Sequence, residues 1–293
     1  MSVGPALTLF AFRAAWRIIP AIPERWANPV VRFVADLAWL RNGEGVRQLQ
    51  SNLARVAGVD PTSDAARRLA RDGMRNYARY WRELFAISGW DRAQLARHVR
   101  VEGAEHLEQA LASGRGVIIV APHSGNWESP AALLVPMMGG ATTVAERLRP
   151  KGLFEAFVAV RERFGLEILP HVGGERPAFH VLRERLEQGR VVALVSDRDL
   201  GRRGIPVSFF GHTARMAGGP ASLALATGAP ILAAECFYEE RRAVCRIHAP
   251  LAVAPGDSVE SVTQRMADQF ARFIAAHPAD WHMLQRIWVG EQA

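Results

Sequence analysis

Residues 117–128 read VIIVAPHSGNWE, a run of four β-branched residues followed by a polar loop. A run of this kind, entered through Gly-Arg-Gly at 114–116, is typical of a strand that is buried on both faces. Similar apolar runs occur at 191–195, 231–234 and 244–247, and stretches with helical periodicity separate the first three runs. This alternation predicts an α/β fold in which a central, mainly parallel sheet is flanked by helices.

The first hundred residues have a different pattern, with apolar residues at three- and four-residue steps and few strand-like runs. We therefore expect one domain over 26–293 that is helical over 26–100 and α/β over 101–293. Residues 1–25 are expected to form a separate helical segment. Residues 76–83, NYARYWRE, concentrate aromatic side chains on one helix, a pattern more typical of core packing than of a ligand site.

The segment 1–25 is apolar enough to suggest a signal peptide or a membrane span. Arg13, Arg17 and Pro20 interrupt it, whereas a span needs about twenty predominantly apolar residues. We therefore expect that it does not cross a bilayer. Two interpretations remain open: an interfacial membrane-associating helix whose arginines meet lipid phosphates, or a helix packed on the domain. The apolar residues concerned are Leu9, Phe10, Phe12, Trp16 and Ile19.

The chain has an excess of basic residues, with 36 Lys and Arg against 29 Asp and Glu and an isoelectric point of about 10.5. This excess favours anionic partners such as a membrane surface or phosphate groups. The sequence shows no nucleic-acid-binding signature, so we expect no nucleic-acid partner.

Cys236 and Cys245 flank an expected turn at 239–242, which predicts an antiparallel strand pair. Two cysteines make no disulfide framework, and we expect reduced thiols in a cytoplasmic protein.

The polar loop after the first strand lies where ligands collect in open α/β sheets, at the carboxyl end of a strand. His123 is in this loop, Asn126 is a candidate helix N-cap, and Glu128 follows. After the second strand, SDRD at 196–199 places three charges beside apolar residues, which is costly unless they bind one another or a ligand. If the two strands are neighbours, Asp197 approaches His123. Either Glu128 or Asp197 then orients the imidazole for general-base catalysis.

Cationic side chains between these loops are candidates for binding substrate phosphates, because a guanidinium group matches phosphate oxygens in bidentate geometry. They are Arg147, Arg149, Lys151 and Arg161. Solvated helix faces explain any single one of them equally well. The full set of expected substrate-binding residues is Asn126, Arg147, Arg161, Arg198 and Asp199.

Several sequence blocks, taken in order, resemble the bacterial lipid A and phosphatidylinositol mannoside acyltransferases, within the wider glycerolipid acyltransferase group. The resemblance runs through nearly the whole chain, and the tail is most similar to the actinobacterial mannoside acyltransferases. The blocks are His123 and Glu128 of a His-four residues-acid motif, SDRDL at 196–200, PVSFFG at 206–211, AGGPASLA at 217–224, TGAP at 227–230 and HPADWHMLQ at 277–285.

The resemblance implies a glycerolipid acyltransferase-like fold and transfer of a long acyl chain, typically palmitoyl, from acyl-CoA to a mannose hydroxyl of a phosphatidylinositol mannoside. It implies that His123 is the general base, with Glu128 or Asp197 as its acidic partner, and that no metal or cofactor is needed. The implied location is the cytoplasmic face of the inner membrane, as a peripheral protein. One departure is that some members are expected to have a glutamate where this chain has the shorter Asp197.

Two other functions remain open on the sequence. One is acylation of a lipid A precursor, often with an acyl carrier protein as donor. The other is a non-catalytic, basic membrane-binding protein, which leaves His123 and Asp197 without a role. A serine hydrolase is disfavoured, because Ser124 is adjacent to His123 and lies in no G-x-S-x-G turn.

Overall fold

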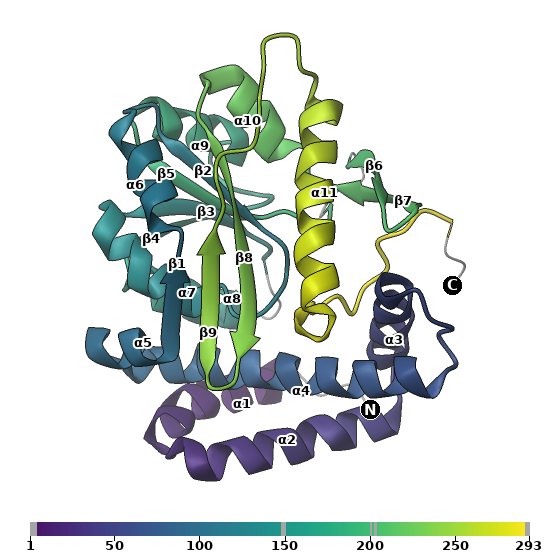
Figure 1. The fold of residues 1–293 in the computed structure, drawn as a ribbon. Helices are drawn as coiled ribbons and strands as arrows, with labels where there is room; N and C mark the ends of the chain where they lie inside the picture. Colours follow the sequence, from purple (N-terminus) through teal and green to yellow (C-terminus); the bar gives the residue numbers. More distant parts are fainter. Residues whose placement is uncertain (1–4, 148–150, 200, 202–203, 291–293) are drawn as a thin grey trace.

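The β-branched runs of the sequence form a seven-stranded sheet with the order β1-β9-β8-β2-β5-β3-β4 (Figure 1). Neighbouring strands are parallel except β8 and β9, which are antiparallel. The expected α/β fold with a mainly parallel sheet is therefore confirmed. This is a computed structural model, and it describes residues 5–147, 151–199, 201 and 204–290.

The strands of the sheet are β1 (Val99–Glu102), β2 (Val117–Ala121), β3 (Ala141–Ala145), β4 (Leu166–Pro170), β5 (Val191–Val195), β8 (Ile231–Glu239) and β9 (Arg242–Ile247). A separate antiparallel hairpin consists of β6 (Ile205–Phe209) and β7 (His212–Met216). The expected antiparallel pair around residues 239–242 is β8 and β9, and the free thiols of Cys236 and Cys245 lie opposite each other in it.

Helices cover both faces of the sheet. Residues of α6 and α7 pack on one face, and residues of α9, α10 and α11 pack on the other. Successive side chains of a strand point to opposite faces, so β2 sends Ile118 and Val120 into the second layer and Val117 into the first. The helices of these layers are α6 (Ala104–Ala112), α7 (Glu128–Leu134), α8 (Lys151–Glu162), α9 (Ala178–Glu187), α10 (Gly219–Thr227) and α11 (Val259–Ala276).

The described residues before β1 form helices from Pro5 to His98, and α4 runs along the end of the sheet at which β8 terminates (Figure 1). Ser63 begins α4 as its N-cap and accepts a hydrogen bond from the N–H of Ala66. The helices are α1 (Pro5–Ile18), α2 (Glu24–Arg41), α3 (Glu44–Ala57), α4 (Asp64–Ala86) and α5 (Arg92–His98). Single 3-10 turns are η1 (Ile19–Ala21), η2 (Ile87–Gly89), η3 (Val135–Met138) and η4 (Pro278–Asp280).

The inner face of α1 packs on the protein. Phe12 and Trp16 make edge contacts with Phe85 of α4 and Phe157 of α8, at ring-centroid distances of 4.9 to 6.0 Å. Leu9 joins the same cluster, whereas Phe10 is 69% exposed. The sequence left open whether the apolar residues of this segment contact lipid or the domain. In the structure Leu9, Phe12 and Trp16 contact the domain. No helix in the described part of the chain is long and apolar enough to cross a membrane.

Helix α2 packs against α4, with Ala27 and Ala35 buried and Trp39 packed against the core. Six other large apolar side chains of α2 face outward, and we call these six the α2 stripe. They are Trp26, Val30, Phe33, Val34, Leu37 and Leu40, each between 36% and 68% exposed. A contiguous apolar surface of this kind on a monomer usually marks an interaction site.

Candidate active site

Strands β2 and β5 run side by side and end level, with Ala121 paired to Val195. The loops after them leave the sheet at one edge, so their polar residues meet there. His123 Nδ1 lies 2.5 Å from Oδ1 of Asp197, and the backbone N–H of His123 donates to Oδ2 of Asp197 at 2.9 Å. The expected approach of Asp197 to His123 is present in the structure.

The carboxyl of Asp197 is fully buried and surrounded by donors. The indole Nε1–H of Trp281 donates to its Oδ2 at 2.9 Å, beside the two contacts with His123. Burial by itself would raise the pKa of this carboxyl, but the charge and hydrogen bonds of His123 and the bond from Trp281 outweigh burial and hold the pKa below its usual value. Asp197 is therefore a carboxylate that binds Nδ1 of His123, so Nε2 is the ring nitrogen that remains for a substrate.

The C-terminal tail fixes the loop that carries His123. The N–H of His282 donates to the carbonyl of His123, and the N–H of Gly125 donates to the carbonyl of Asp280, both at 2.8 Å. Gly125 has a φ of +58°, and a Cβ there would lie 2.6 Å from the backbone of Cys236. Only glycine lets the loop pass this close to β8.

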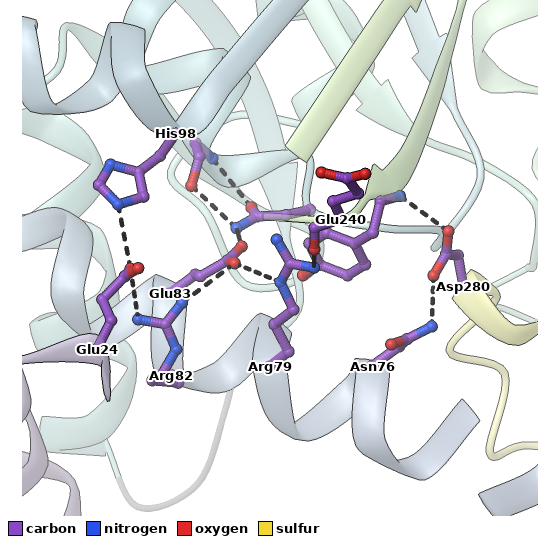
Figure 2. Close-up of polar contacts among 11 residues, drawn as sticks. Glu24, Asn76, Arg79, Arg82, Glu83, His98, Glu240 and Asp280 are labelled. Atoms are coloured by element: carbon purple, nitrogen blue, oxygen red, sulfur yellow. Dashed lines mark hydrogen bonds and ion pairs between the residues drawn. The ribbon is translucent and has the colours of Figure 1, made fainter. Parts of the chain in front are cut away.

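Asp280 is a buried carboxyl on this tail. It accepts hydrogen bonds from Nδ2 of Asn76 at 2.7 Å and from the N–H of Tyr238 at 2.9 Å (Figure 2). Burial raises its pKa to about 6, although the hydrogen bond from Tyr238 and the charge of Arg79 act in the opposite direction. Asp280 thus joins α4, β8 and the loop that carries His123, and burial of its carboxyl makes the ionised form less favourable.

Glu128, the other candidate partner of His123, is paired with an arginine and does not orient the imidazole in this structure. Its carboxylate forms an ion pair with Arg161 of α8, in which Nη2 contacts Oε1 and Nε donates to Oε2 at 3.1 Å. The hydroxyl of Tyr80 lies 3.4 Å from Oε1 of Glu128. The ion pair joins α7 to α8 and leaves Asp197 as the carboxylate that contacts the imidazole.

An apolar cavity of about 320 Å³ opens beside His123, whose side chain is 24% exposed. It lies between α7 and the adjacent face of the sheet. Small side chains of the strands leave this space unfilled, namely Ala121, Ala145, Ala193, Ala234, Cys236 and Cys245. On the opposite side the cavity is lined by Pro130, Ala131, Leu134, Val135 and Met138. Its volume lies at the lower end of the range for small-molecule sites, roughly 300 to 1,000 Å³.

Of the expected substrate-binding residues, Arg161 and Arg198 line this cavity. Arg147 is exposed and donates to the carbonyl of Gly173, and it does not line the cavity. The carboxylate of Asp199 accepts hydrogen bonds from the backbone of its own loop. Asn126 is fully buried, and its hydrogen bonds go to protein groups. Arg149 and the side chain of Lys151 lie outside the described residues.

Two tail residues adjoin the site without being among the expected site residues. Trp281 contacts Asp197, and His282 packs against the rings of Tyr77 and Tyr80 at centroid distances of 5.4 and 5.6 Å. Burial, followed by the nearby charge of His123, lowers the pKa of His282 to about 3, so this second imidazole is neutral. The sequence pointed to Trp281 and His282 only through the block 277–285, which is part of the family resemblance.

This arrangement can perform base-assisted attack on a carbonyl carbon. A neutral imidazole, oriented by a carboxylate at Nδ1, can remove a proton from a hydroxyl through Nε2. The adjacent cavity can hold a hydrocarbon chain, because its lining is predominantly apolar. In the described part of the chain no group of three or more His, Cys, Asp or Glu side chains is placed to hold a metal ion.

Comparison with known proteins identifies relatives along the full length of the chain. The family model of the bacterial lipid A biosynthesis acyltransferases matches residues 4–289. A phosphatidylinositol mannoside acyltransferase of Mycolicibacterium smegmatis is 44% identical over 289 residues, which cover 99% of this chain and 94% of that protein. Phosphatidylinositol mannoside acyltransferases from two strains of Mycobacterium tuberculosis are 44% identical over 295 residues, covering 99% of this chain and 91% of theirs.

Proposed function

The chain belongs to the bacterial lipid A biosynthesis acyltransferase family and is an acyltransferase, and on that premise we propose that it moves a palmitoyl group from acyl-CoA to a mannose hydroxyl of a phosphatidylinositol mannoside. The names of its relatives support the acceptor. The observation that carries the proposal is the imidazole of His123, held by the buried carboxylate of Asp197 at the opening of an apolar cavity. Family membership argues against a non-catalytic membrane-binding protein.

In this mechanism His123 is the general base. Its Nε2 takes the proton of the mannose hydroxyl while the hydroxyl oxygen attacks the thioester carbonyl, and Asp197 stabilises the imidazolium that forms. Collapse of the tetrahedral intermediate breaks the C–S bond, and the proton on His123 passes to the thiolate leaving group. Base assistance contributes about 10²–10⁴-fold to such a reaction, and positioning of the two substrates contributes more.

The acyl chain would occupy the cavity between α7 and the sheet. Each buried methylene contributes about 0.8 kcal/mol, so a long chain gains most of its binding free energy there. Arg198 lines the cavity and is paired only weakly, at 3.4 Å, with the exposed carboxylate of Glu146. We assign Arg198 and Arg161 to the phosphates of the donor or of the acceptor. No metal or cofactor takes part in the proposed reaction.

The protein is proposed to act as a peripheral protein on an anionic membrane surface, at the cytoplasmic face of the inner membrane. The α2 stripe supports this proposal, because it combines exposed apolar side chains with the exposed arginines Arg25, Arg32 and Arg41 on the same helix. Insertion of apolar side chains and attraction of arginines to lipid phosphates strengthen binding together. In this proposal the main contact is α2, and α1 adds Phe10 and Ile18.

Vesicle partitioning tests the membrane proposal. Phe33→Ser should weaken binding to vesicles that contain anionic phospholipid, without loss of thermal stability, because Phe33 is 68% exposed. Val172→Ser is the matched control, since Val172 is 64% exposed but lies on the loop after β4. Equal partitioning of the wild type and Phe33→Ser would contradict the proposal that α2 contacts the membrane.

The substrates are tested with a panel of donors and acceptors. The full-length protein is incubated with palmitoyl-CoA or palmitoyl-acyl carrier protein, together with a phosphatidylinositol mannoside or a lipid A precursor. Mass spectrometry then identifies the acylated product. We expect palmitate on a mannose of the mannoside with the CoA donor. Acylation of the lipid A precursor alone would contradict the proposed acceptor and leave the acyl transfer intact.

A further inference from the structure

A polar cluster on α4 is hydrogen-bonded to the loop that carries His123, and Figure 2 shows its members Arg79, Arg82 and Glu83. Its centre is the carboxylate of Glu83, a residue that is only 4% exposed. Oε1 of Glu83 accepts hydrogen bonds from Nε of Arg79 at 2.7 Å and from Nη2 of Arg82 at 3.3 Å. Arg82 is also paired with Glu24, at the start of α2, at 3.1 Å. The two arginines compensate the buried negative charge, which would otherwise be strongly unfavourable.

The second oxygen of Glu83 reaches the catalytic loop. Oε2 accepts a hydrogen bond from Nδ2 of Asn126 at 2.7 Å, and Nδ2 also donates to Oγ of Ser129 at 2.9 Å. On its other side, Oδ1 of Asn126 accepts the backbone N–H groups of Glu128 and Ser129, each at 3.0 Å. Asn126 thus caps the first turn of α7 while Glu83 holds it from behind.

Glu83 and the start of α7 favour the same orientation of the Asn126 amide. A carboxylate can only accept hydrogen bonds, so the NH₂ group of Asn126 must face it. The amide oxygen is then turned toward the free N–H groups at the start of α7, where a cap is needed. His123 lies three residues before Asn126 in the same loop. This loop is also hydrogen-bonded to the tail at Gly125 and His123, and to Asp197 through His123.

We propose that Glu83 is a positioning residue for acyl transfer: acting through Asn126, it fixes the conformation of the loop that carries His123. It touches neither substrate nor the reacting atoms, and Glu83 is not among the residues that line the cavity. The inference rests on the proposed role of His123 as the base. Misplacement of a catalytic group by about 1 Å can cost about 100-fold in rate, so loss of the hydrogen bond between Glu83 and Asn126 is expected to slow acyl transfer.

Kinetics of Glu83→Gln, Asn126→Ala and the double variant test the proposal in the full-length protein. A glutamine is neutral and can present either its oxygen or its NH₂ group, so the charge-assisted hydrogen bond from Nδ2 of Asn126 is weakened or lost, while Oδ1 of Asn126 keeps its two backbone donors. We expect kcat for acyl transfer to fall about 10- to 100-fold, with KM for donor and acceptor nearly unchanged. Because both residues act through one hydrogen bond, the double variant should be no slower than the slower single variant.

A matched control and a milder variant keep this test interpretable. Glu187→Gln removes an exposed glutamate that pairs with Arg183 on α9, and its kcat should equal that of the wild type. Glu83→Asp keeps the charge near the arginines but draws the carboxylate away from Asn126. Glu83→Asp should also lower kcat, but by a smaller factor than Glu83→Gln. It provides the test if Glu83→Gln fails to fold.

Proton NMR separates an effect of Glu83 on the position of His123 from an effect on protein stability, and it needs no substrate. The ring proton that His123 shares with Asp197 should give a downfield proton resonance in the full-length protein, assigned by its loss in Asp197→Asn. We expect that signal to shift or broaden in Glu83→Asp and Glu83→Gln but not in Glu187→Gln. An unchanged signal with unchanged kcat per folded molecule, or additive effects in the double variant, would overturn the proposal. Failure of the wild type to acylate any glycolipid would instead overturn the proposed function.

Discussion

Asp197 and Glu128 both follow the carboxyl ends of neighbouring strands, Asp197 in the loop after β5 and Glu128 as the first residue of α7, yet they do different things. Asp197 is fully buried and receives donors from His123 and Trp281. Glu128 is 6% exposed and is paired with Arg161. Glu128, which is nearer to His123 in the sequence, forms an ion pair between α7 and α8. Asp197, which is 74 residues from His123 in the sequence, contacts the imidazole. Changes at Asp197 should therefore affect the rate, whereas changes at Glu128 should affect mainly stability.

The largest expected effect comes from Asp197→Asn. Asparagine keeps the shape but can present an NH₂ group to the imidazole, which favours the tautomer without a free lone pair on Nε2. We expect kcat to fall about 10³–10⁴-fold, as for the analogous change in a serine protease triad, with KM nearly unchanged. Steady-state kinetics on protein whose fold is verified by circular dichroism checks this. Retention of a tenth of the wild-type rate would mean that Asp197 does not orient the base.

Glu128→Gln should act mainly on the free energy of unfolding. It leaves the guanidinium of Arg161 without its carboxylate, and breaking a buried ion pair in this way costs about 4 kcal/mol. Denaturant unfolding measures the loss. The double variant Glu128→Gln with Arg161→Met should recover much of it, because no uncompensated charge remains. A kcat deficit as large as that of Asp197→Asn, at full stability, would contradict the division between the two acids.

Asp280 sharpens the comparison, because its pKa is displaced in the opposite direction from that of Asp197. A carboxyl whose pKa is raised in the folded state, here to about 6 from 3.8, favours folding below its unfolded pKa, and this contribution is lost as the pH rises through about 6. Between about pH 4 and pH 7 the wild type should lose roughly 2 kcal/mol of unfolding free energy relative to Asp280→Asn. Unfolding curves of both proteins across this range test it, and parallel pH dependences would refute it.

The smallest effect is expected for Asp197→Glu, which introduces the residue that some family members are expected to have. The present carboxylate already reaches Nδ1 at 2.5 Å in a fully buried position, so an added methylene must displace the ring or Trp281. We expect kcat to fall about tenfold, since overpacking a buried position costs about 1–3 kcal/mol. A rate equal to or above that of the wild type would show that the pocket accommodates either acid.

The sequence predicted the features that follow from local periodicity. β-Branched runs predicted a mainly parallel sheet, which is confirmed. The polar ends of the runs at 117–121 and 191–195 predicted an approach of Asp197 to His123 on the condition that the two strands are neighbours, and left Glu128 as the alternative. The strands are neighbours, and Asp197 contacts His123. The roles of these residues remain predictions, because contact alone does not establish catalysis.

Features that depend on distant contacts could not be predicted. No spacing rule relates Trp281 to Asp197, or Glu83 to Asn126, because each pair meets only through the fold. The aromatic run at 76–83 predicted core packing, but Tyr80 and Trp81 also line the cavity. Periodicity shows that α1 and α2 have an apolar side without showing whether protein covers it. In the structure protein covers much of α1 and leaves the α2 stripe exposed.

The central claim is that the ring of His123 removes the proton of the acceptor hydroxyl. It is tested most directly by the rate at which His123→Ala transfers palmitate from palmitoyl-CoA to a phosphatidylinositol mannoside, with product measured by mass spectrometry. We expect a loss of at least about 100-fold, because base assistance contributes about 10²–10⁴-fold, while thermal stability and vesicle binding match the wild type. Transfer within about threefold of the wild-type rate would contradict the claim and require a different base.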